Sequence, residues 1–132
     1  MDTQFKRIYV LLPAKVLVPK PEFGALGDRL LPMPVGRSAI QLGHVVSKMR
    51  VGLADTYGSQ PITTIGYSVR NHKELIKLIN EMSAGGFNVW GFYDRDPKFY
   101  ESDHGVLTAV CTEPITREQA EPFLGHLELF AK

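Results

Sequence analysis

Hydrophobic and polar positions along the chain follow two periodicities. Short apolar runs rich in β-branched residues predict four strands. These strands lie at residues 7–15, 63–69, 88–93 and 106–112. Apolar residues at helical spacing predict helices at residues 36–57 and 71–84 and a short third helix that opens at Thr116. The order β-α-β-α-β-β-α predicts an α/β domain with three layers, α/β/α, around a four-stranded mixed sheet whose last strand is antiparallel.

Capping residues, glycines and prolines predict where these elements begin and end. Asn71 and the Thr116–Gln119 pair are typical helix caps, and the two glycines at 85–86 predict the end of the second helix. Pro13 predicts that the first strand stops pairing nearby. Residues 16–35 contain four prolines and two glycines, so they predict a long irregular connection, either a lid or an ordered structural loop. The apolar tail at residues 127–130 predicts no element of its own.

Topology predicts where the functional edge lies. Right-handed crossovers make the first three strands parallel, so their carboxyl ends share one edge, where open α/β sheets bind ligands. Arg37 follows the first strand there, and Asp94 ends the third strand. The fourth strand is expected to run antiparallel to the others, so its early residue Thr108 lies near the same edge. Residues 95–105 connect these last two strands and are expected on the same rim.

The helix that begins after residue 35 carries the most informative polar pattern. Arg37, Gln41 and His44 stand at i, i+4 and i+7, which places them on one face. The cation at a solvent-facing helix start, together with the helix dipole, favours an anionic ligand. Glycines at 43 and 52 indicate close packing against a neighbour, and Gly58 is a candidate C-cap. The apolar face expected in the core consists of Ile40, Leu42, Val46, Met49 and Leu53.

Composition narrows the class of protein. The 132 residues, 44% of them hydrophobic, suit one domain spanning residues 1–132. A net charge of +1 argues against a distributed nucleic-acid surface and leaves a local basic patch open. No run approaches the about 20 apolar residues of a membrane span, and no signal peptide is evident, so a cytoplasmic location is expected. The lone Cys111 is interpreted as a buried, inert thiol. His104 and Asp103 lack metal-ligand spacing, so no metal or cofactor is expected.

Motifs in several parts of the chain resemble the type 2 peptidyl-tRNA hydrolase family. GRSAIQLGH at residues 36–44 resembles the family's GKIAAQCGH helix start. GVLT at 105–108 is similar to its GTxT strand start, and GHLEL at 125–129 is similar to its closing GHLKL. The resemblance implies a mixed sheet between helices, a homodimer, and hydrolysis of the ester that joins peptide to tRNA.

The resemblance also shows departures. Arg37 stands where the family has lysine, and Tyr100 stands nearest to the position of the family's first functional threonine. The family's acid falls at Asp94 when counted from the strand, or at Asp96 when counted back from Gly105. An arginine keeps the positive charge that suits phosphate or carboxylate, but it cannot act as a base.

Six residues are therefore candidates for catalysis: Arg37, Gln41, His44, Asp94, Asp96 and Thr108. Arg37 would hold a phosphate or polarise the carbonyl, an aspartate would activate water, and Thr108 with Gln41 would supply hydrogen bonds. The aspartates can instead be turn residues or salt-bridge partners of Arg37, and His44 a partly buried histidine bonded to backbone. The alternative function is a non-catalytic module that binds a small anionic or nucleotide-like ligand.

Overall fold

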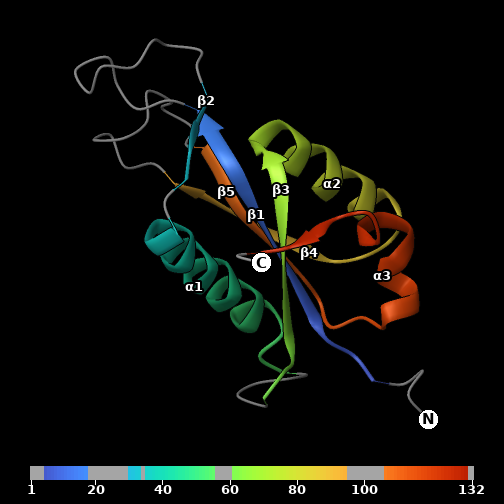
Figure 1. Ribbon diagram of the computed structural model, residues 1–132. Coiled ribbons are helices and arrows are strands. Elements are labelled where there is room, and N and C mark those ends of the chain that lie inside the picture. Colours follow the sequence, from blue (N-terminus) through green and yellow to red (C-terminus); the bar gives the residue numbers. More distant parts are fainter. Residues whose placement is uncertain (1–4, 18–29, 34, 56–60, 95–105, 131–132) are drawn as a thin grey trace.

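The computed structural model describes residues 5–17, 30–33, 35–55, 61–94 and 106–130 (Figure 1). These residues form six strands and three helices. In chain order the elements are β1 (Ile8–Leu17), β2 (Leu30–Pro32), α1 (Val35–Gly52), β3 (Thr64–Asn71), α2 (His72–Ala84), β4 (Val89–Asp94), β5 (Val106–Thr112), α3 (Arg117–Leu124) and β6 (Glu128–Leu129). None of these three helices is long and apolar enough to cross a bilayer.

The strands form one mixed sheet with the order β4-β5-β1-β3-β6, and β2 pairs with β1. β1 and β3 are parallel, whereas β5 runs antiparallel to both of its neighbours, β1 and β4. The α/β class, the mixed sheet and the reversal of the fourth predicted strand are confirmed. The count of four strands is wrong, because the sheet also contains β2 and β6. Strands of three and two residues are too short to show a periodicity in the sequence.

The first predicted strand is longer than its proline suggested. Pairs between β1 and β3 continue past Pro13 to Lys15↔Asn71, while pairs with β5 stop at Leu11. Pro13 therefore coincides with the loss of one neighbouring strand and does not end β1. Beyond it, Leu17 pairs with Leu30 of β2, so the connection predicted as irregular begins and ends in regular structure. Residues 18–29 of that connection lie outside the described residues.

The helices lie on opposite sides of the sheet, α1 on one side and α2 with α3 on the other (Figure 1). Alternate residues of β1 serve the two sides, as the strand period requires. On one side, Ile8, Val10 and Leu12 pack with Val45 and Met49 of α1. On the other, Tyr9 and Leu11 pack with Leu75, Leu78 and Met82 of α2 and with Ala120 and Leu124 of α3. The five β1 side chains are at most 2% exposed, so β1 is the centre of both cores.

Helices α2 and α3 begin as their sequences predict. The Asn71 side chain accepts a hydrogen bond of 3.0 Å from the backbone N–H of Glu74. Thr116 and Gln119 form a reciprocal capping box. Gly86 follows the end of α2 with φ of 94°, a left-handed conformation that favours glycine. These capping signals are local in sequence, which is why they could be read without the fold.

Helix α1 departs from its prediction in three ways. It ends at Gly52 and not at residue 57, and Gly58 lies outside the described residues. Ile40, expected in the core, is 60% exposed. A Cβ added to Gly52 would lie 2.9 Å from the Trp90 ring, which confirms close packing there, whereas Gly43 has open space around it. Met49 lies in the core as expected, together with Val45. Leu42, Val46 and Leu53 are partly buried and pack against this core, so the expected apolar face is confirmed except at Ile40.

Candidate functional site

The first turn of α1 meets the end of β4 through an ion pair. Arg37 Nη2 lies 2.6 Å from Asp94 Oδ2. The side chains are 22% and 11% exposed, so the pair is partly shielded from water and Arg37 is not the fully solvent-facing residue that was expected. The salt-bridge alternative for Asp94 is therefore confirmed. It is the topology predicted from the strand order that brings these two residues, 57 positions apart, to one edge of the sheet.

Two further residues extend this pair into a hydrogen-bonded cluster. Gln41 Nε2 donates to Asp94 Oδ2 at 2.9 Å, and the Thr108 hydroxyl donates to Gln41 Oε1 at 3.0 Å. Thr108 Oγ1 also lies 3.4 Å from the Phe92 carbonyl, but a hydroxyl has one proton and the shorter contact is with Gln41. We call Arg37, Gln41, Asp94 and Thr108 the polar cluster. Its four members come from α1, β4 and β5.

The polar cluster is largely closed to solvent. Counted over the whole residue, Gln41 is 3% exposed, Asp94 is 8% exposed and Thr108 is 0% exposed. Buried polar groups are stable only when their hydrogen bonds are satisfied, and each broken contact costs about 1–3 kcal/mol. The Thr108 donor fixes the orientation of the Gln41 amide, and the amide donates to the same Asp94 oxygen that accepts from Arg37. The carboxylate therefore has one defined position at the end of β4.

Beyond the polar cluster, two more nitrogen-bearing side chains of α1 contact residues of β4. The exposed His44 ring stacks on Phe92 with centroids 4.6 Å apart and planes 16° apart. Within the described residues His44 makes no hydrogen bond, so the alternative of a partly buried, backbone-bonded histidine is wrong. Lys48 Nζ donates to the Gly91 carbonyl at 2.8 Å. We call Arg37, Gln41, His44 and Lys48 the row along α1. This row covers roughly 16 Å of helix, at 1.5 Å per residue.

Lys48 is the residue of this row that sequence reasoning missed. It stands at i+11 from Arg37, so it continues the i, i+4, i+7 spacing that identified Gln41 and His44. Extending that pattern by one more turn would have found it. Asp96, Tyr100, Asp103 and His104 lie outside the described residues, so the choice between Asp94 and Asp96 as the family's acid stays open.

Cys111 has the environment expected of an inert thiol. It is fully buried in β5, and burial raises the pKa of its thiol to about 12. The thiolate is the reactive form of cysteine, so this residue has no nucleophile to offer at neutral pH. The interpretation of Cys111 as a buried structural residue is confirmed.

The chain matches no protein-family model and no curated protein. The polar cluster, the row along α1 and the motif resemblance are therefore the features of this chain that bear on its function.

Proposed function

We propose that this protein hydrolyses the ester bond between a peptide and tRNA, and that Arg37 and Asp94 act at the reacting end of the substrate. One observation carries the proposal. Arg37 and Gln41 of the first resembling motif, Thr108 of the second and the acid at the end of β4 form one continuous chain of hydrogen bonds. Segments that resemble motifs of one hydrolase family thus contribute side chains to the same polar cluster.

The proposed reaction adds water across the ester. The water oxygen bonds to the carbonyl carbon, the bond from that carbon to the ribose oxygen breaks, and the ribose oxygen leaves with a proton. Asp94 takes a proton from the attacking water, and Arg37 stabilises the negative charge that develops on the carbonyl oxygen. A guanidinium has five N–H donors, so it can hold Asp94 and bind a substrate oxygen at the same time.

Gln41 and Thr108 act in this proposal as positioning residues. Their exposures of 3% and 0% keep them from touching a substrate in this conformation. This revises the expectation that they bond to the substrate directly. Their task is to hold the Asp94 carboxylate in place, since a displacement of about 1 Å at a reacting group can cost on the order of 100-fold in rate.

The row along α1 provides a surface for the tRNA end of the substrate. His44 and Lys48 lie beside β4 on the same face as Arg37, and the exposed His44 ring offers a flat surface. Cations combined with planar rings bind single-stranded nucleic acid through phosphate contacts and base stacking. Such binding weakens steeply with added salt because counterions are released from the phosphates.

A second candidate is favoured by the closure of the polar cluster. Asp94 already accepts hydrogen bonds from Arg37 and Gln41, and Thr108 is inaccessible. A cluster that satisfies itself can serve as the wall of a binding module for a small anion, with no chemistry. Tight binding of a small anion without tRNA affinity would support this module, and salt-sensitive tRNA binding would support the hydrolase.

Single-turnover hydrolysis of N-blocked aminoacyl-tRNA by the purified protein tests the proposal. We expect Arg37→Ala and Asp94→Asn each to lower the rate by about 100-fold or more, in line with the loss of an oxyanion donor or a general base. Arg37→Lys restores the family's residue and should equal or exceed the parent. Arg70→Ala and Asp55→Asn remove exposed charges elsewhere and should match the parent, with circular dichroism as the folding control. Absence of turnover in both the parent and Arg37→Lys would overturn the hydrolase.

A further inference from the structure

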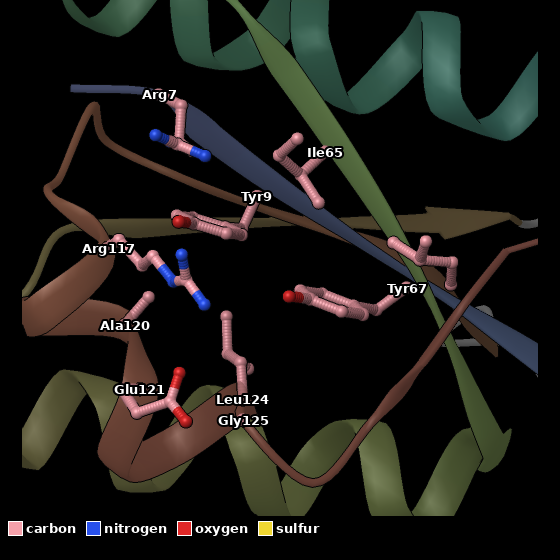
Figure 2. Close-up of a pocket in the computed structure, with 10 residues that line it drawn as sticks. Arg7, Tyr9, Ile65, Tyr67, Arg117, Ala120, Glu121, Leu124 and Gly125 are labelled. Carbon is pink, nitrogen blue, oxygen red and sulfur yellow. The ribbon is translucent and has the colours of Figure 1, made fainter. Parts of the chain in front are cut away.

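A pocket of about 320 Å³ opens between β1, β3 and α3 (Figure 2). It lies on the side of the sheet opposite to α1, because Tyr9 and Leu124 in its wall belong to the core shared with α2 and α3. The residues that give the pocket its chemistry are Arg7, Tyr9, Tyr67, Arg117, Glu121 and Leu124. Ligand pockets of small molecules begin at roughly this size.

Two arginines reach the pocket from different parts of the chain (Figure 2). Arg7 directly precedes β1, and Arg117 is the first residue of α3. Within the described residues neither guanidinium forms a salt bridge, although Arg37 at the other site does. Arg7 Nε is buried without a hydrogen-bond partner, and Arg7 Cζ lies 5.0 Å from the centre of the Phe5 ring. Together with Glu121 the two cations give the pocket an excess of one positive charge.

Two tyrosines line the pocket next to these cations (Figure 2). The rings of Tyr9 and Tyr67 stack with centroids 6.0 Å apart and planes within 5° of each other. Figure 2 shows both hydroxyls turned toward the side on which α3 lies. Burial raises the pKa of Tyr9, while the charges of Arg7 and Arg117 act in the opposite direction. Both guanidiniums are thus close enough to act on one hydroxyl, which stays protonated and able to donate at neutral pH.

We propose that this pocket binds a small organic oxyanion, a phosphate monoester or a carboxylate, with an apolar body. Arg7 and Arg117 bind the charged end, since guanidinium groups match the geometry of phosphate and carboxylate oxygens. The tyrosine hydroxyls donate to the same oxygens. Buried Ala120 and Leu124 provide an apolar floor for the rest of the ligand. Glu121 accepts a hydrogen bond from a hydroxyl or amine of the ligand.

This site is independent of the proposed hydrolase. Its residues lie on the other side of the sheet from α1 and share no side chain with the polar cluster. The pocket can therefore bind its ligand whether or not the protein hydrolyses peptidyl-tRNA, and loss of one activity leaves the other measurable.

Isothermal titration calorimetry with three probes tests the pocket: phenyl phosphate, benzoate and inorganic phosphate. We expect phenyl phosphate or benzoate to bind the intact protein at millimolar concentration or tighter, and inorganic phosphate to bind more weakly because it lacks the apolar body. Whichever of the first two binds tighter identifies the ligand class. Arg117→Ala should weaken that binding by about 10- to 100-fold, the effect of losing a hydrogen bond to a charged group.

Matched variants separate a built site from general attraction to charge. Arg117 is exposed and makes no side-chain hydrogen bond within the described residues, so its removal should leave the fold intact. Arg70→Ala removes an exposed arginine of β3 outside the pocket and should bind like the parent. Tyr67→Phe keeps the ring and should weaken binding less than Arg117→Ala. The proposal is overturned if no probe binds at millimolar concentration, or if Arg70→Ala weakens binding as much as Arg117→Ala does.

Discussion

Helices α1 and α2 cover opposite faces of the same sheet, yet they bury different kinds of side chain. α2 buries Leu75, Leu78 and Met82 along one stripe and exposes most of its polar residues. α1 buries Ser38 and Gln41 beside Val45 and Met49, and it exposes two large apolar residues, Ile40 at 60% and Val51 at 79%. The two helices therefore contribute differently to the packing of the two faces of the sheet.

The difference indicates what each helix contributes. Burial of apolar side chains is the main stabilising term in folding, and α2 is built for it. Replacing a buried polar network by apolar residues is often neutral or stabilising, so the polar packing of α1 is weak evidence for a role in stability. We infer that α1 is oriented by its contacts with Asp94 and Thr108, and that this orientation serves the site.

The largest effect is expected in the core of α2. Leu75 is fully buried, so Leu75→Ala removes apolar contacts and leaves a cavity, at a cost of about 2–5 kcal/mol in the free energy of unfolding. Urea denaturation followed by circular dichroism measures it. The hydrolysis rate per folded molecule should not change, and a loss of rate in fully folded protein would show that α2 also supports the site.

The ion pair of α1 should show a smaller effect with strong coupling. Arg37→Ala leaves Asp94 partly buried with fewer donors and should cost about 1–3 kcal/mol of stability. Adding Asp94→Ala should recover part of that cost, because no unpaired charge remains. A double-mutant cycle from urea denaturation gives the coupling energy. Purely additive effects of the two changes would contradict the ion pair.

These two helices also show how much the sequence could predict. α2 and its caps follow from local signals, since Asn71 bonds to a residue three positions away. The meeting of Arg37, Asp94 and Thr108 followed from strand order alone. The burial of Gln41 could not be predicted, because it depends on partners 53 and more residues away. The exposure of Ile40 could not be predicted either, because the helical spacing alone places it with the residues that pack on the sheet.

The stability of the protein should depend on pH through His72, the one buried polar side chain of α2. His72 Nδ1 is buried without a partner, and its pKa is lowered by burial and by the charge of Lys73. Above the ordinary pKa of 6.5 the histidine is neutral in both states. As the pH falls below it, the unfolded chain binds the proton first, so stability is lost until the folded pKa is passed.

Urea denaturation between pH 7.5 and pH 5 checks this expectation at about half-unit steps, a range that spans the ordinary histidine pKa. His72→Gln should lose less stability than the parent as the pH falls. His126→Gln, which removes an exposed histidine, should follow the parent. Identical slopes for the parent and His72→Gln would contradict the role of His72.

The smallest effect is expected on the outer face of α1. Ile40→Gln should change the free energy of unfolding by no more than about 0.5 kcal/mol, because the side chain is 60% exposed. The amphipathic pattern alone would place Ile40 in the core and predict a loss of several kcal/mol. Urea denaturation decides between them, and a loss of 2 kcal/mol or more, roughly the cost of a core truncation, would contradict the exposed position of Ile40.

The most direct test of the account is to make the polar cluster apolar. In the double variant Gln41→Met with Thr108→Val, both partners of the buried hydrogen bond are replaced by side chains of similar volume. The cost in stability should stay within about 1–3 kcal/mol, since the hydrogen bond between residues 41 and 108 is removed with both of its partners and Asp94 loses one donor but keeps Arg37. Single-turnover hydrolysis of N-blocked aminoacyl-tRNA should fall by on the order of 100-fold as Asp94 loses its fixed position. A folded double variant that hydrolyses the substrate at the parent's rate would contradict the claim that this cluster is kept for function.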